Sequence, residues 1–212
     1  SAVHVYNIDS RTLEKKVIIT DTLKRLFNDL ALNSRGEAFI TDSYGSKIYR
    51  LTFEAEMPEV FAGPDSLLLY VNGLVLSPDD KIIYAASGAY ITLIDTETRA
   101  VSIIGDPLSS GSAGIDGLAF YKGSLLGVVN SKDTENEMFV ARYVLSSDMK
   151  EIKDMIILDK GNQLFNLPTT CTLIGDELYY LGNTSLRLYF QDKTNSKGLF
   201  MNPLILKIKL SD

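Results

Sequence analysis

Three polar residues stand at equal intervals along the chain, each near the start of an apolar run. Asn28 opens FNDLAL, Asn72 opens VNGLVL and Asp116 opens IDGLAF, and 44 residues separate each from the next. One carboxylate and two amide oxygens form a hard-oxygen set, which suits Ca²⁺ or Mg²⁺ better than soft metals. If the fold brings them together, they predict a divalent-cation site. Calcium takes about six to eight oxygens, so another carboxylate or water must complete it.

The same residues have a simpler interpretation. Asn and Asp are common in turns that lead into strands, and Asn72-Gly73 and Asp116-Gly117 are ordinary turn pairs. In a repeat protein, three such turns could be inherited with the repeat. The sequence leaves both interpretations open.

The elements around these residues form a repeat. FNDLALNSRGEAFITDS is followed by VNGLVLSPDDKIIYAAS, IDGLAFYKGSLLGVVN and a weaker copy, LPTTCTLIGDELYYLGN, in which Pro168 takes the matching place. Each copy is an apolar strand, a turn and a second strand, and further strand patterns follow it. Antiparallel strands in units of roughly 40–45 residues are typical of β-propeller blades.

We therefore predict an all-β protein, a six-bladed β-propeller of four-stranded antiparallel blades. Residues 1–212 form a single propeller domain, in which 1–22 is an outer half-blade. Full blades are expected over 27–63, 70–106, 114–160 and 165–210. Because this makes four and a half blades, we expect the N-terminal one and a half blades to lie outside this chain. A five-bladed ring with an improvised closure is the alternative.

A propeller also predicts which other residues surround the three openings. First strands begin at one face and second strands return to it, so polar residues at these ends should line the rim of a pocket. They are Asp29, Asp42, Ser43, Ser87, Asn130 and Asn183. The alternative for each is strand-end solvation, and Asp29 could simply bond its own turn.

Composition and charge limit the function classes. The net charge is −6 with the two signs interspersed, and nucleic acid is an unlikely partner because binding it requires a basic stripe. A single cysteine, Cys171, excludes an intramolecular disulfide and a cysteine-based zinc site. The sequence shows neither a signal-peptide pattern nor a transmembrane segment, which predicts a soluble protein of unknown location. A leader upstream of residue 1 stays open.

At its repeated motifs the sequence resembles the senescence marker protein/gluconolactonase/luciferin-regenerating enzyme family of six-bladed propellers. The wider superfamily includes paraoxonases and strictosidine synthase-like proteins. The resemblance rests on FNDLAL, VNGLVLSPDDKIIY, IDGLAF and LPTTCTLIGDELYY, in that order. It implies a cation on the channel axis, Ca²⁺ first and Mg²⁺, Mn²⁺ or Zn²⁺ as alternatives. The implied ligands are Asn28, Asn72, Asp116 and a first-blade glutamate that this chain does not contain. Asp116 would also be the catalytic general base.

Two functions are consistent with this sequence. The first is a divalent-cation-dependent hydrolase of a lactone or related ester, with a small-molecule substrate at the channel mouth. The second is a non-catalytic propeller that binds a ligand or a protein partner, with any calcium structural. Fold alone cannot choose between them, because propellers host both kinds of function.

Overall fold

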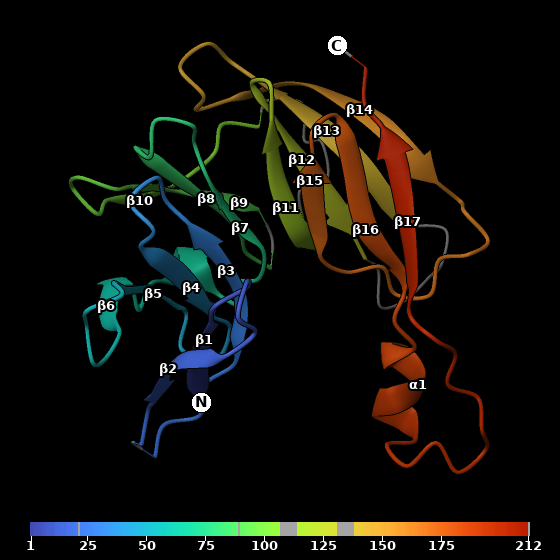
Figure 1. The fold of residues 1–212 in the computed structure, drawn as a ribbon. Helices are drawn as coiled ribbons and strands as arrows, with labels where there is room; N and C mark the ends of the chain where they lie inside the picture. The colour runs from blue at the N-terminus through green and yellow to red at the C-terminus, as the bar shows by residue number, and fades with distance from the viewer. Residues whose placement is uncertain (21, 89, 107–113, 131–137, 212) are drawn as a thin grey trace.

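The computed structural model describes residues 1–20, 22–88, 90–106, 114–130 and 138–211. Within these residues the chain is built almost entirely from antiparallel strands, which form five sheets. The sheets follow one another around an arc from the N-terminal hairpin to the C-terminal sheet (Figure 1). The predicted all-β propeller architecture is confirmed in this arrangement. The number of blades in a closed ring stays a prediction.

Three of the sheets have four strands each, joined in chain order. The first contains β3 (Phe27–Leu32), β4 (Ala38–Asp42), β5 (Lys47–Leu51) and β6 (Glu59–Ala62). After the short 3₁₀ helix η1 (Ser66–Leu68), the second contains β7 (Leu74–Leu76), β8 (Ile82–Ala86), β9 (Ile91–Asp95) and β10 (Val101–Ile103). The third contains β11 (Ile115–Tyr121), β12 (Ser124–Val129), β13 (Phe139–Leu145) and β14 (Ile152–Lys160).

The two ends of the arc have smaller sheets. At the N-terminal end, β1 (Ala2–Tyr6) and β2 (Leu13–Ile18) form a sheet of two strands among the described residues, where the sequence predicted an outer half-blade. At the C-terminal end, β15 (Cys171–Ile174), β16 (Glu177–Asn183) and β17 (Leu204–Lys209) form a sheet of three strands. The structure thus differs from the full blade expected over 165–210. After β16 the chain enters helix α1 (Leu186–Gln191) and returns directly to pair with β16.

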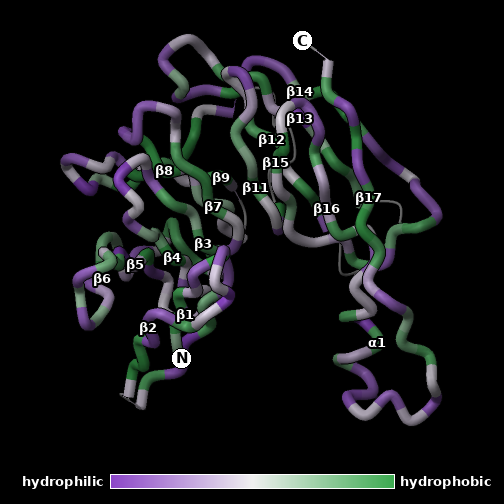
Figure 2. The backbone as a smooth tube through the Cα atoms, viewed as in Figure 1, coloured by the Kyte–Doolittle hydropathy of each residue, from purple (hydrophilic) through white to green (hydrophobic). Residues whose placement is uncertain are grey.

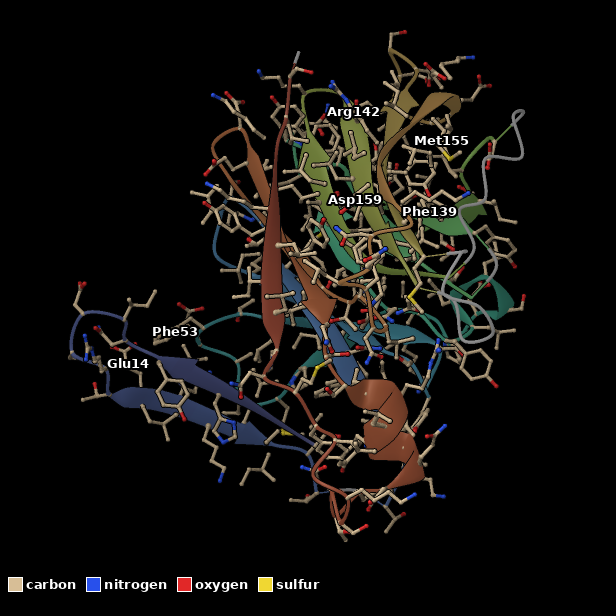
Figure 3. The ribbon with its side chains drawn as sticks, turned by 90° about the vertical axis from the view of Figure 1, so that its right-hand side faces the viewer. Glu14, Phe53, Phe139, Arg142, Met155 and Asp159 are labelled. Carbon is tan, nitrogen blue, oxygen red and sulfur yellow. The ribbon has the colours of Figure 1, made fainter. Side chains whose placement is uncertain are left out.

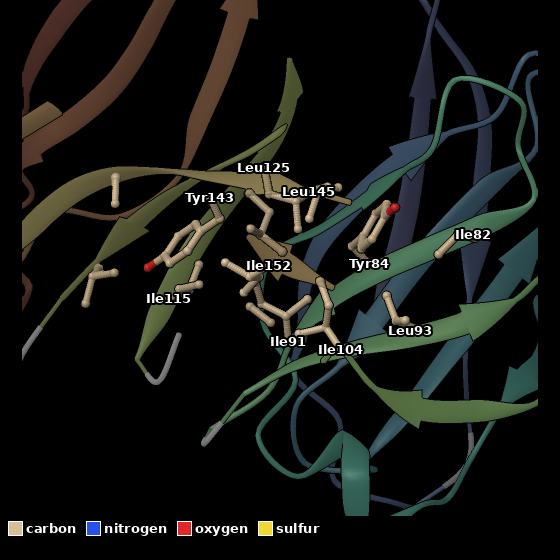
Figure 4. Packing of buried hydrophobic residues seen from close by; sticks show 14 residues of the cluster. Ile82, Tyr84, Ile91, Leu93, Ile104, Ile115, Leu125, Tyr143, Leu145 and Ile152 are labelled. Atoms are coloured by element: carbon tan, nitrogen blue, oxygen red, sulfur yellow. The ribbon is translucent and has the colours of Figure 1, made fainter. Parts of the chain in front are cut away.

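The core lies in layers between successive sheets. One layer, between the second and third sheets, includes Tyr84, Ile91, Leu125, Tyr143 and Ile152 (Figure 4). Each of these side chains is fully buried. Burying an aliphatic side chain of this size contributes roughly 2 kcal/mol to the free energy of unfolding. Similar layers join the first sheet to the second, the third to the last, and the β1–β2 hairpin to the first.

This layering explains why the strand patterns differ along the chain. Every residue of β4, β8 and β12 is buried, because a neighbouring sheet covers each face of these strands. They accordingly read as nearly continuous apolar runs. By contrast, β17 alternates in burial, and apolar and charged residues alternate in its second half (Figure 2). One face of the last sheet is therefore exposed.

The first strands of the blades stand side by side on the inside of the arc. β3 contacts β7, β7 contacts β11 and β11 contacts β15. Openings that are 44 residues apart in sequence thus lie on neighbouring strands. In the described part of the chain, no helix is long and apolar enough to cross a membrane.

Candidate functional site

The inner strands β3 and β11 begin with a β-bulge, and β7 has a comparable opening. In β3 the register shifts between Phe27 and Leu30, and in β11 it shifts between Ile115 and Gly117. Before β7, the Asn72 N–H donates to the Ala86 carbonyl at 2.8 Å, and the Ala86 N–H donates to the Gly73 carbonyl at 2.8 Å. A bulge turns a side chain away from the regular alternation, and it is common beside functional sites.

Asp116 is the centre of the polar cluster at these openings. Asn130 Nδ2 donates to Asp116 Oδ2 at 2.8 Å. Burial raises the pKa of Asp116, the polar side chains of Asn130 and Asn72 lower it in part, and the negative charge of Asp29 raises it. Of the predicted metal ligands, Asn72 and Asp116 therefore lie close to each other.

Asn28 joins the cluster through Ser43. Asn28 Nδ2 donates to Ser43 Oγ at 2.9 Å, and Ser43 Oγ donates to the Val71 carbonyl at 2.6 Å, directly before Asn72. With Nδ2 engaged, the amide Oδ1 of Asn28 is the atom that could face a ligand. The three predicted ligands are thus connected through short contacts across three blades.

Asn130 likewise connects two neighbouring blades, the third sheet and the last one. Besides Asp116, its Nδ2 donates to the Pro168 carbonyl at 3.1 Å, at the opening of the last sheet. Two of the predicted rim residues, Ser43 and Asn130, therefore fix the spacing between successive blades at the site.

Asp29 links two inner strands with its carboxylate. Oδ1 accepts from its own Leu30 N–H at 2.9 Å, and Oδ2 accepts from the Leu74 N–H of the next inner strand at 3.0 Å. Burial raises the pKa of Asp29, and these two backbone bonds lower it in part. The expectation that Asp29 could bond its own turn therefore covers only half of its contacts.

The other three predicted rim residues fix local backbone. Asp42 Oδ1 accepts from the Leu26 N–H at 3.0 Å and the Gly45 N–H at 3.1 Å. Ser87 Oγ donates to the Tyr90 carbonyl at 2.8 Å, and Asn183 Oδ1 accepts from the Ser185 N–H at 3.0 Å. Because all three predicted side chains are buried, solvation of strand ends does not explain them.

Sequence reasoning placed the fourth opening one residue too early. The Thr169 N–H donates to the Leu181 carbonyl at 3.0 Å, as Asn72 does to Ala86, so Thr169 and not Pro168 occupies the matching position. Proline was misassigned because the weaker copy has no Asn-Gly or Asp-Gly pair to fix the alignment. Thr169 is buried and brings a hydroxyl group to the fourth opening.

Cys171 and His4 also lie near this cluster. Nothing in the sequence predicted that either residue would be close to Asp29. Burial, and then the negative charges of Asp29 and Asp116, raise the pKa of the Cys171 thiol to about 12, so it stays protonated at neutral pH. His4 lines a cleft of about 460 Å³ with Asn28 and Asp29. The remaining lining residues are Ala2, Val3, Phe27, Leu30 and Ile40.

The chemistry of the cluster fits a hard divalent cation. Asp116 supplies a carboxylate, and Asn28 and Asn72 supply amide oxygens. A cation would also offset the cost of holding the half-buried Asp116 charge near Asp29. Among the residues that the structure describes, no three His, Cys, Asp or Glu side chains gather to hold a metal. Water, a bound ligand or a side chain outside the described residues would therefore have to supply the remaining oxygens.

Comparisons with known proteins identify the architecture. No family model and no curated protein matches the chain. A chain of a nidogen/laminin complex is 14% identical with a TM-score of 0.65, and the match covers 84% of this chain and 65% of that one. The fold is that of a β-propeller.

Two bacterial enzymes share this fold. A catalytically inactive virginiamycin B lyase from Staphylococcus aureus is 15% identical with a TM-score of 0.60, covering 100% of this chain and 64% of that one. A gluconolactonase from Xanthomonas campestris is 16% identical with a TM-score of 0.58, covering 85% and 62%. The chain spans less than two thirds of the length of these three structures. At such identities the similarity shows the fold alone.

Proposed function

We propose that this propeller is a divalent-cation-dependent hydrolase of a lactone or a related ester. The observation that carries the proposal is the half-buried Asp116 carboxylate, held by Asn130 and close to Asn72 and to a second half-buried carboxylate, Asp29. Buried carboxylates with raised pKa values occur preferentially at functional sites. The gluconolactonase among the similar structures and the motif resemblance favour this reaction class over others.

Each residue has a distinct role in the proposed reaction. Asn28, Asn72 and Asp116 would hold the cation, which when bound polarises the ester carbonyl as a Lewis acid. Asn130 holds Oδ2 of Asp116, so the carboxylate keeps a fixed orientation while it accepts a proton from the attacking water. The water oxygen bonds to the carbonyl carbon, the ring C–O bond breaks, and the proton passes to the leaving alkoxide.

The proposal is tested by lactone hydrolysis with the full-length protein, with calcium and with chelator. We expect turnover to require the cation and to fall at least about 100-fold in Asp116→Asn, as for loss of a general base. Asp9→Asn is the control, because Asp9 is exposed in the β1–β2 turn. Turnover that survives chelator or Asp116→Asn would contradict the proposal. Tight calcium binding without turnover of any lactone would instead favour the non-catalytic binding function.

A further inference from the structure

Residues 184–203, between β16 and β17, project from the body of the last sheet. They contain α1, none of whose residues is buried. The segment extends beyond the ends of β16 and β17, away from the five sheets (Figure 1). We call residues 184–203 the projecting segment. Because no residue of α1 is buried against the described part of the chain, packing within that part does not account for its apolar side chains.

Its shape is fixed by local hydrogen bonds from polar side chains. Asp192 accepts from the N–H groups of Thr194 at 3.1 Å and Ser196 at 2.9 Å, and from both hydroxyls. Asn195 Oδ1 accepts from the Phe200 N–H at 3.0 Å. At the base, Ser185 Oγ accepts from the Met201 N–H at 3.1 Å. The segment is therefore a built projection with a defined conformation.

This projection displays large apolar side chains to solvent. Tyr189 is 43% exposed, Phe190 69%, Leu199 54% and Met201 56%. The Tyr189 ring centroid lies 5.9 Å from that of Phe190 and 6.3 Å from that of Phe200, so the aromatic rings form one cluster. Exposed apolar clusters on a soluble fold commonly mark a surface that is covered in function.

The charge of the projection identifies what could cover it. The projecting segment has three basic residues, Arg187, Lys193 and Lys197, and one acidic residue, Asp192, whereas the whole chain has a net charge of −6. Basic residues beside Phe, Tyr, Leu and Met side chains form the composition that binds the interface of an anionic bilayer. We propose that the projecting segment docks this protein on an anionic lipid surface.

The position of the projection relates docking to the candidate site. Its base follows Asn183, which bridges to Asn166, and Asn166 lies close in sequence to the opening residue Thr169. The docked segment therefore adjoins the same end of the blades as Asp116. Docking itself does not depend on the proposed hydrolase function, so the two proposals can fail separately.

The test is co-sedimentation of the purified protein with vesicles, in chelator so that calcium cannot bridge protein and lipid. One set contains phosphatidylcholine alone, and the other an equimolar mixture with phosphatidylserine. We expect binding to the mixed vesicles only, and weakening by roughly tenfold in Phe190→Ser. Lys193→Gln combined with Lys197→Gln should weaken binding by a further thirtyfold or so, because each lysine adds about 1 kcal/mol near such a surface.

The matched control is Phe53→Ser. Phe53 is 57% exposed and lies beside the β1–β2 hairpin, apart from α1 (Figure 3). This variant should bind vesicles as the unmodified protein does, and circular dichroism should show both variants folded. Equal binding by the two variants, or equal binding to both vesicle types, would overturn the proposal. So would self-association that Phe190→Ser abolishes, because a second copy would then be the occupant.

Discussion

At Asp116, burial and hydrogen bonding act on the carboxyl pKa in opposite directions. Burial and the Asp29 charge raise the pKa, while Asn130 and Asn72 stabilise the ionised form. The folded protein therefore binds a proton at Asp116 more readily than the unfolded chain does. Ionising this group opposes folding, and the opposition grows as the pH rises through the raised pKa.

Replacing Asp116 with asparagine should therefore stabilise the cation-free protein at neutral pH. Asparagine keeps the shape and an acceptor oxygen but removes the half-buried charge. We expect thermal unfolding at pH 7 to shift to higher temperature in Asp116→Asn. The shift should vanish at acid pH, where the aspartate is protonated in both states. A lower unfolding temperature of Asp116→Asn at pH 7 would contradict this, because it would mean that the folded protein stabilises the Asp116 charge.

Ser43 offers a second test at the scale of a single residue. Its buried hydroxyl donates to the Val71 carbonyl and accepts from Asn28 Nδ2. Ser43→Ala leaves both groups without this partner, so we expect a loss of about 2 kcal/mol in the free energy of unfolding. Urea denaturation measures it, with the exposed Ser10→Ala as control, for which the change should stay within about 0.5 kcal/mol.

Among the elements, the inner strands approach one another at glycine. A Cβ on Gly73 would lie 2.3 Å from the Asp116 carbonyl oxygen, and one on Gly117 would lie 2.7 Å from the Cys171 nitrogen. Neither glycine has a positive φ, so close approach of backbones and not turn geometry requires them. The turn-pair interpretation of Asn72-Gly73 and Asp116-Gly117 thus gives the wrong reason for these glycines.

Gly73→Ala should consequently separate β7 from β11. We expect it to lower the free energy of unfolding by roughly 2 kcal/mol or more, since backbone atoms must move to admit the methyl group. Gly88→Ala is a matched control, because a Cβ there would meet only ordinary contacts, the nearest at 3.6 Å. Equal destabilisation of the two variants would contradict the close approach of the inner strands.

Most elements could be predicted from sequence because their burial follows their pattern. Strands such as β4 and β8 are covered on both faces and read as nearly continuous β-branched and apolar runs. Helix α1 could not be predicted, because its six residues have no buried face and hence no helical periodicity. The apolar residues of α1 lie exposed on the projecting segment, and neither a strand pattern nor a helix pattern in the sequence predicts such a position.

For the whole molecule, the site exists only because separate blades converge. The 44-residue repeat was sufficient to predict that Asn28, Asn72 and Asp116 open neighbouring strands. The links between them could not be predicted, because Ser43 and Asn130 act across blade interfaces that no local pattern records. Thr169 was missed because the fourth copy of the repeat is weak. Aligning it one residue too early places Pro168 instead of Thr169 at the strand opening.

Calcium titration by isothermal calorimetry tests the central claim most directly. The claim is that Asn28, Asn72 and Asp116 together hold one divalent cation. The full-length protein should bind calcium at a single site, and calcium at about 100 times its dissociation constant should add about 2.7 kcal/mol to the free energy of unfolding. Asp116→Asn should lose both the heat and the stabilisation, while Asp9→Asn keeps them. An intact protein that gives no binding heat, or an Asp116→Asn variant that binds as well, would contradict the account.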